Sequence, residues 1–246
     1  MTRRGLTSFS LLQAGGFCLA VMLAGCGTTQ HTSTPHTATI DARLEQAAAD
    51  AQRQGRTQDS LAYLEKLYRG NSDNPDAALK YTAALRDAGF YNRALAVIEP
   101  FGTRHATDNP LVMVEYATLL TEMGNYKAAE DAARKAVTLD DTSGRAYHLL
   151  GIALDAQGHH PQAKIAFEKA LEHWEGDPSP VLNNMGLNMA SLGFIDDAID
   201  TLRRALATAP NRSEIERNLR IISALRYEPS LDGTGIPMPG AKPAGE

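Results

Sequence analysis

The amino-acid sequence predicts an all-α solenoid of about five helix-turn-helix repeats with a C-terminal capping helix. A glycine recurs at nearly constant spacing, 34, 35, 34 and 35 residues apart, at Gly55, Gly89, Gly124, Gly158 and Gly193. Each glycine separates two segments whose apolar residues follow a helical period. The chain is 43% hydrophobic but only 6% aromatic, which favours helices packed through alanine and leucine over an all-β core.

The hairpin around Gly158 illustrates the pattern. Small residues, Gly151, Ala163 and Ala170, stand where two helices must approach closely, and larger residues such as Phe167 stand beside them. With the turn glycine as the fifteenth residue, the repeats span 41–74, 75–109, 110–143, 144–178 and 179–212. The pattern predicts one repeat array from 41 to 227.

Helix starts are predicted by capping residues. Asn74, Asn109 and Ser179 each precede a proline suited to a first helical turn. Ser213 and Glu216 form a capping-box pattern that opens the helix 213–227. Its apolar stripe, Ile215, Leu219, Ile222 and Leu225, predicts that this helix covers the last bare face of the solenoid.

The period near 34 and the small–large apolar helix pairs resemble the tetratricopeptide repeat (TPR) family. The resemblance implies a concave groove for a helix or an extended peptide, lined by the first helix of each repeat. Positions 2, 5, 9 and 12 face such a groove, and position 6 holds an asparagine that grips peptide backbone in some arrays. On this sequence the candidate groove residues are Glu45, Gln52, Leu79, Arg86, Val114, Thr118, Arg145, His148, Asp155, Asn183, Asn184 and Leu187.

The N-terminus has the features of an export signal. Arg3 and Arg4 precede an apolar run too short for a confident membrane span, so residues 1–25 are predicted to be a signal peptide. The run ends in Leu-Ala-Gly-Cys26, which resembles a bacterial lipobox. That resemblance implies acylation of Cys26, with palmitate among the acyl groups, and residues 26–40 as a flexible tether. Gly27 after the cysteine favours an anchor in the outer membrane, with the repeat array facing the periplasm. Retention in the inner membrane stays open, as does the export route, general or twin-arginine.

Several functions are disfavoured by the sequence. The formal charge of −5 and the scattered basic residues argue against a nucleic-acid partner. Besides Cys26 the chain has only Cys18, within the signal, so no thiol chemistry is expected in the array. His160 occupies a packing position after the turn, and the sequence contains no catalytic or metal motif. We therefore expect a non-enzymatic protein without metal, cofactor or small-molecule substrate.

A further resemblance concerns the biological setting. The segments Asp177-Pro178, 181–187 and 217–219, together with the lipobox and repeats, resemble TadD-type assembly proteins of tight-adherence (Flp) pili. The resemblance implies protein partners, a secretin or another pilus-assembly component. Two alternatives stay open: an adaptor for peptidoglycan hydrolases or another envelope complex, and a regulatory subunit of an envelope enzyme. Residues 228–246, rich in proline and glycine, are predicted to be disordered, and the oligomeric state is undecided.

Overall fold

A computed structural model describes residues 35–104, 108–226, 231–232 and 236–237. Within these ranges it contains eleven α-helices, a short π-helical turn and two short strands. The helices are α1 Pro35–Arg53, α2 Thr57–Gly70, α3 Pro75–Asp87, α4 Tyr91–Glu99, α5 Pro110–Glu122, α6 Tyr126–Leu139, α7 Gly144–Ala156, α8 His160–Glu172, α9 Ser179–Ser191, α10 Ile195–Thr208 and α11 Ser213–Leu225. The turn η1 spans Pro100–Arg104, and β1, Leu231–Asp232, pairs antiparallel with β2, Ile236–Pro237.

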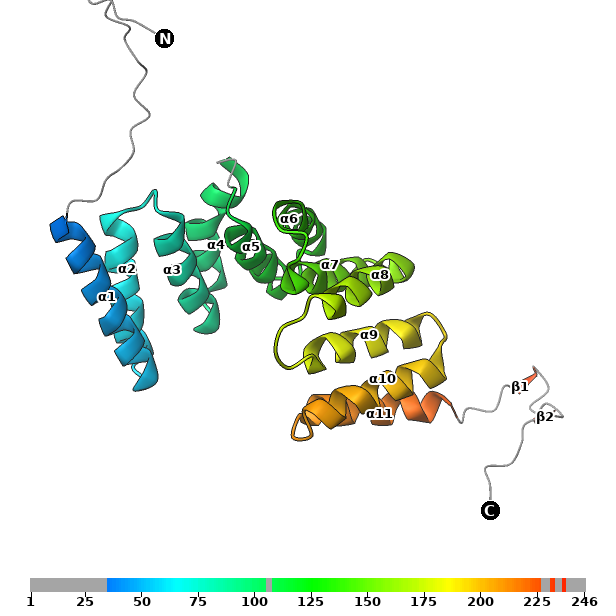
Figure 1. Ribbon diagram of the computed structural model, residues 1–246. Helices are drawn as coiled ribbons and strands as arrows, with labels where there is room; N and C mark the ends of the chain where they lie inside the picture. Colours follow the sequence, from blue (N-terminus) through cyan, green and yellow to red (C-terminus); the bar gives the residue numbers. More distant parts are fainter. Residues whose placement is uncertain (1–34, 105–107, 227–230, 233–235, 238–246) are drawn as a thin grey trace, which may run out of the picture.

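The helices form successive antiparallel hairpins that stack along a curved path (Figure 1). Each odd-numbered helix from α1 to α9 packs against the even-numbered helix that follows it, and each hairpin packs against the next. α11 has no such partner among the described residues and packs against α10 and α9. The predicted all-α solenoid of five repeats and a closing helix is therefore confirmed.

The recurring glycine ends the first helix of every hairpin. Gly158 has a φ of +79°, and the other four turn glycines also lie at positive φ, where a β-carbon is disfavoured. In this turn the Gly158 N–H donates to the carbonyl of Asp155 at 2.9 Å, and the His159 N–H donates to that of Leu154 at 2.9 Å. These two bonds satisfy carbonyls at the helix end, which explains why the spacing of glycines marks the repeats.

Of the four predicted capping residues, two are confirmed and two are wrong. The side chains of Asn74 and Asn109 accept hydrogen bonds from the first turns of α3 and α5. Ser179 and Ser213 instead form the first residues of α9 and α11 and make no capping bond. At α9 the neighbouring Asp177 takes over, because its carboxylate accepts from both the N–H and the hydroxyl of Ser179, at 2.9 and 2.8 Å.

Two further boundaries differ from the prediction. α1 begins at Pro35, inside the stretch expected as a tether, because proline is well suited to a first helical turn. α11 ends at Leu225, and β1 and β2 fall inside the predicted tail 228–246. The signal peptide 1–25, Cys26 and most of the tether, with the rest of the tail, lie outside the described residues.

The closing helix combines a polar end face with an unexpected apolar strip. Ile215 and Ile222 are buried against α9 and α10, as predicted. At the position where α7 has Gly151, α11 has exposed Arg220, so its outer side cannot receive another helix closely. Leu225, however, is 45% exposed rather than part of the buried stripe, and Ile221 is 53% exposed. The prediction of a covering helix holds, but the placement of Leu225 was wrong.

Candidate binding groove

The first helices of neighbouring repeats are joined by paired side chains. Position 5 of one repeat meets position 6 of the next, because these positions face each other across adjacent first helices. The polar pairs are Glu45 with Lys80 at 2.7 Å, His148 with Asn184 at 2.9 Å and Asn183 with Asn218 at 2.9 Å. The predicted groove residues Glu45, His148, Asn183 and Asn184 thus connect neighbouring repeats through an ion pair and hydrogen bonds, which are called ties below.

In the C-terminal half these ties form a continuous chain of hydrogen bonds. The amide of Asn218 on α11 donates to Asn183, the amide of Asn183 donates to Asn184 at 3.3 Å, and the amide of Asn184 faces Nε2 of His148. The chain connects α11, α9 and α7. Asn184 therefore has an amide already engaged within the protein, which differs from the expected grip on a peptide backbone.

His148 is a neutral, half-buried histidine. Burial lowers its pKa to about 4, the positive charge of Arg145 acts in the same direction, and a hydrogen bond to the backbone of Pro180 opposes them. Its ring also lies against Phe167 and edge-on to Trp174, with centroids 6.0 and 5.3 Å apart. Since its ring contacts two aromatic side chains and its hydrogen bonds reach Asn184 and the backbone of Pro180, His148 serves packing between α7 and α9.

Asp155 holds the turn after α7 against α9. Its Oδ1 lies 2.7 Å from Nδ1 of His160 and accepts from the amide of Asn188 at 2.7 Å. The same amide donates to the backbone carbonyl of His160 at 3.0 Å. His160 is therefore held in this turn by polar contacts, which the sequence pattern did not indicate. The role of Asn188 was not predicted either, because its partners lie in the preceding repeat.

Arg86 stands at the centre of a charge cluster between α3 and α5. Its guanidinium lies 2.7 Å from Glu115, 3.0 Å from Glu122 and 3.1 Å from Asp87. Glu115 is buried, and burial raises the pKa of its carboxyl, while the hydrogen bond and charge of Arg86 oppose the rise. One cation is therefore shared by three carboxylates.

Three predicted groove residues are buried. Val114 and Thr118 belong to the run 112–120 of α5, all of which is buried because α3, α4, α6, α7 and η1 surround this helix. The Thr118 hydroxyl donates to the carbonyl of Val114 within the helix at 2.8 Å. Asn183 is 5% exposed. The structure thus corrects their expected exposure, whereas Leu79 and Leu187 are half-buried.

A pocket of about 360 Å³ opens between α1 and α3. It brings together the predicted groove residues Glu45 and Gln52, which stand at its rim. Its apolar lining comes from Ala48, Ala49, Leu64, Ala83 and Ala84, and the charged residues Lys80 and Asp87 complete the lining. The N-terminal part of the predicted groove is therefore a real depression with an apolar floor and a charged rim.

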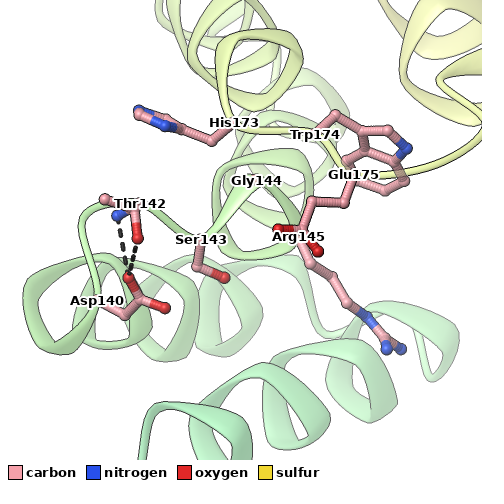
Figure 2. A pocket seen from close by; sticks show the side chains of 8 residues that line it. All are labelled: Asp140, Thr142, Ser143, Gly144, Arg145, His173, Trp174 and Glu175. Carbon is pink, nitrogen blue, oxygen red and sulfur yellow. Dashed lines mark hydrogen bonds between the residues drawn. The ribbon is translucent and has the colours of Figure 1, made fainter.

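A second pocket, also of about 360 Å³, surrounds the start of α7 (Figure 2). It contains Arg145, whose guanidinium is directed away from Asp140 and Thr142. Asp140 is already engaged, since it accepts from the N–H and the hydroxyl of Thr142. Trp174, at the opposite wall, donates from its indole nitrogen to the carbonyl of Asp177 at 2.8 Å, which fixes the loop before α9.

A third depression, of about 390 Å³, lies at the turn edge of the second repeat. Phe90, Tyr91 and Met123 line it and are each more than a third exposed. The Arg93 guanidinium lies 5.5 Å from the Phe90 ring centroid. The sequence pattern did not predict this exposed edge, because residues after the turn glycine follow the same period as packing positions.

Within the described ranges, His, Cys, Asp and Glu side chains do not gather in groups of three or more that could hold a metal ion. Among the described helices, none is both long and apolar enough to cross a membrane. Cys26, the predicted lipidation site, lies outside the described residues.

Comparison with known proteins identifies the repeats. The family model described as tetratricopeptide repeat matches residues 112–143 and 144–172, in the third and fourth predicted repeats. A TPR repeat-containing protein of Dictyostelium discoideum is 28% identical over 109 residues, 42% of this chain and 41% of that protein. Protein O-mannosyl-transferase TMTC1 of Homo sapiens is 24% identical over 179 residues, 65% of this chain and 20% of that protein. The chain thus spans less than half the length of either curated relative.

Solved structures agree with this arrangement of helices. MamA of Desulfovibrio magneticus matches with a TM-score of 0.59 at 18% identity, over 70% of this chain and 97% of its own. A TPR protein of Thermus thermophilus matches with a TM-score of 0.61 at 15% identity, over 75% and 99%. YrrB, a TPR protein with an unusual peptide-binding site, matches with a TM-score of 0.57 at 19% identity, over 76% and 98%. The described array therefore has the fold of a tetratricopeptide-repeat solenoid, and residues 112–172 match the repeat itself.

Proposed function

We propose that this protein is a lipid-anchored periplasmic scaffold that assists the assembly of a tight-adherence pilus or a related secretion machine. Its TPR array would bind a protein partner, a secretin or another pilus-assembly component, and acylated Cys26 would hold the array at the outer membrane. The observation that supports the scaffold function is the pocket between α1 and α3, whose lining includes the predicted groove residues Glu45 and Gln52.

Tetratricopeptide arrays generally act as non-enzymatic scaffolds for protein partners, because stacked hairpins present an extended surface. The described residues fit that role. The titratable groups Glu115, His148 and Asp155 form hydrogen bonds within the fold, so their contacts support structure rather than a reaction. The lipobox and the segments 177–178, 181–187 and 217–219 support the membrane anchor and the pilus setting. The similarity to protein O-mannosyl-transferase TMTC1 does not support an enzymatic function, since this chain spans only 20% of that protein.

The proposal is tested by purifying the tagged full chain from membranes of its native host, with a Cys26→Ala variant as the control. Growth with a clickable palmitate reports lipidation, and mass spectrometry identifies retained proteins. We expect label on the wild type, none on the variant, and a secretin retained only by the anchored protein. Retention of peptidoglycan hydrolases, or of an envelope enzyme whose activity changes, would instead support one of the alternative roles. An unlabelled wild type would contradict the anchor.

A further inference from the structure

The pocket between α1 and α3 exists because this part of the array has alanines where later repeats have larger residues. Position 9 is Ala49 in the first repeat and Ala83 in the second, whereas repeats four and five have Ile152 and Leu187. Position 10 of the second repeat is Ala84, where the third repeat has the fully buried Leu119 and the fourth again has an alanine, Ala153. The small alanine side chains leave open space beside Leu64, a buried core residue that lines the pocket.

The pocket suits one or two bulky apolar side chains. Its volume of about 360 Å³ falls at the small end of ligand pockets, which run from about 300 to 1,000 Å³. A complete helix cannot enter a space of this size, but a side chain projecting from a helix or an extended segment can. Burying such an anchor in an apolar pocket is the usual source of affinity in a protein interface.

Around the rim of the pocket carboxylates outnumber cations, although Arg145 also acts on Glu115. Its own lining includes two carboxylates, Glu45 and Asp87, and one ammonium group, Lys80, which is already paired with Glu45. The adjacent cation, Arg86, is shared by Asp87, Glu115 and Glu122, as described above. Asp87, which lines the pocket, has a side chain that is 56% exposed, and Glu122, which shares Arg86 with it, has one that is 35% exposed, so both charges reach solvent.

From these observations we propose that the pocket between α1 and α3 binds a partner segment in which a bulky apolar side chain is flanked by lysine or arginine. The apolar side chain would fill the space above Leu64, and the flanking cations would lie near Asp87 and Glu122. This assignment rests on the scaffold function proposed above and specifies the chemistry of the partner. Charge complementarity of this kind selects partners and accelerates their association.

The test uses the full chain in detergent and two fluorescein-labelled peptides that each contain one tryptophan, flanked by two lysines or by two glutamates on each side. Fluorescence anisotropy measures their affinities at low and high salt. We expect the lysine-flanked peptide to bind at least tenfold more tightly, with a preference that shrinks at high salt because screening weakens the attraction. Equal affinities, a preference for glutamate, or no binding of either peptide would overturn the proposal.

Two variants separate the apolar and charged parts. Ala83→Ile introduces the residue that the fourth repeat has at this position, so it fills the pocket with a side chain that the fold accepts elsewhere. It should lower affinity for the lysine-flanked peptide at least tenfold. Asp87→Asn with Glu122→Gln keeps the pocket and should reduce only the preference for lysine. Asp131→Asn, an exposed charge change on α6, is the matched control and should leave binding unchanged.

Failure of this inference is distinguishable from failure of the scaffold function. If the membrane-anchored wild type and the Ala83→Ile variant retain the same partner from host membranes equally well, the pocket is not the binding site although the scaffold function stands. If the anchored wild type retains no partner, the scaffold function itself fails. If Ala83→Ile does not fold, the surface variant Asp87→Asn with Glu122→Gln still decides the charge preference.

Discussion

Gly151 of α7 lies directly against the ring of Phe167 of α8. A β-carbon added at Gly151 would stand 2.5 Å from Cε1 of Phe167, closer than two carbon atoms can pack. The two helices of the fourth repeat therefore depend on a residue without a side chain at this crossing, and the sequence pattern predicted this close approach.

Gly151→Leu should destabilise the array by at least about 1–3 kcal/mol, the usual cost of overpacking a core. Urea denaturation followed by circular dichroism measures the change, and Ala156→Leu, at an exposed position of the same helix, is the control. The double variant with Phe167→Ala should lose less stability than the sum of the single changes, because the residues are in contact. Strict additivity would contradict the contact.

Arg86→Met should destabilise the protein by about 3 kcal/mol, since it leaves the buried carboxylate of Glu115 without its cation. A raised carboxyl pKa in the folded state means that the folded protein takes up a proton more readily than the unfolded chain. The loss should therefore diminish as the pH falls from 7 toward the unfolded value of about 4.3. Urea denaturation at pH 7 and pH 5 measures this recovery, which should be absent when Glu115→Leu is added.

The lowered pKa of His148 should make the stability of the fold depend on pH. Its pKa is about 4 in the folded protein and about 6.5 in the unfolded chain, so its neutral form stabilises the fold above pH 6.5. That stability is lost as the pH falls through this window, by about 2 kcal/mol at pH 5. His148→Gln should lower this pH dependence in urea denaturation, whereas His159→Gln, at an exposed turn position, should not. Identical pH profiles for wild type and His148→Gln would contradict the assignment.

The caps provide a fourth prediction. Asn74→Ala removes a side chain that accepts from two N–H groups of α3, at 2.9 and 3.4 Å, and should cost about 0.5–2 kcal/mol. Ser213→Ala should change stability little, because Ser213 makes no capping bond at α11. Thermal denaturation of the two variants compares them directly. An equal loss for both would restore Ser213 as the cap.

The repeat architecture was predictable because it depends on local signals with a fixed period. Gly158 and its equivalents end the first helices, and Ala163 and Ala170 permit close packing. The same signals recur in the other repeats, so the period can be read several times along the chain. The capping residue of α9 was not predicted correctly, since both Asp177 and Ser179 are good capping residues and only the loop conformation decides between them. Helix α1 extends to Pro35 for the same kind of local reason.

The groove was predictable only in part, because exposure depends on neighbours that the sequence pattern does not reveal. Glu45 and Gln52 lie at a pocket, as the groove positions suggested. Val114 occupies an equivalent position but is buried, because η1 and the flanking repeats close around α5. The cluster around Arg86 could have been anticipated from opposite charges at position 12 of one repeat and position 6 of the next.

The hydrogen-bond chain that ends at His148 has a direction, and this direction has a consequence. Asn218, Asn183 and Asn184 each present an amide nitrogen to the next acceptor, and Nε2 of His148 is the final acceptor. A proton added at Nε2 would face the amide nitrogen of Asn184, which is also a donor. The side-chain amide of Asn184 would then have to rotate to present its oxygen, and the amides of Asn183 and Asn218 would have to rotate in turn. The location of a single proton in the fourth repeat thus sets the orientation of polar groups as far as the closing helix.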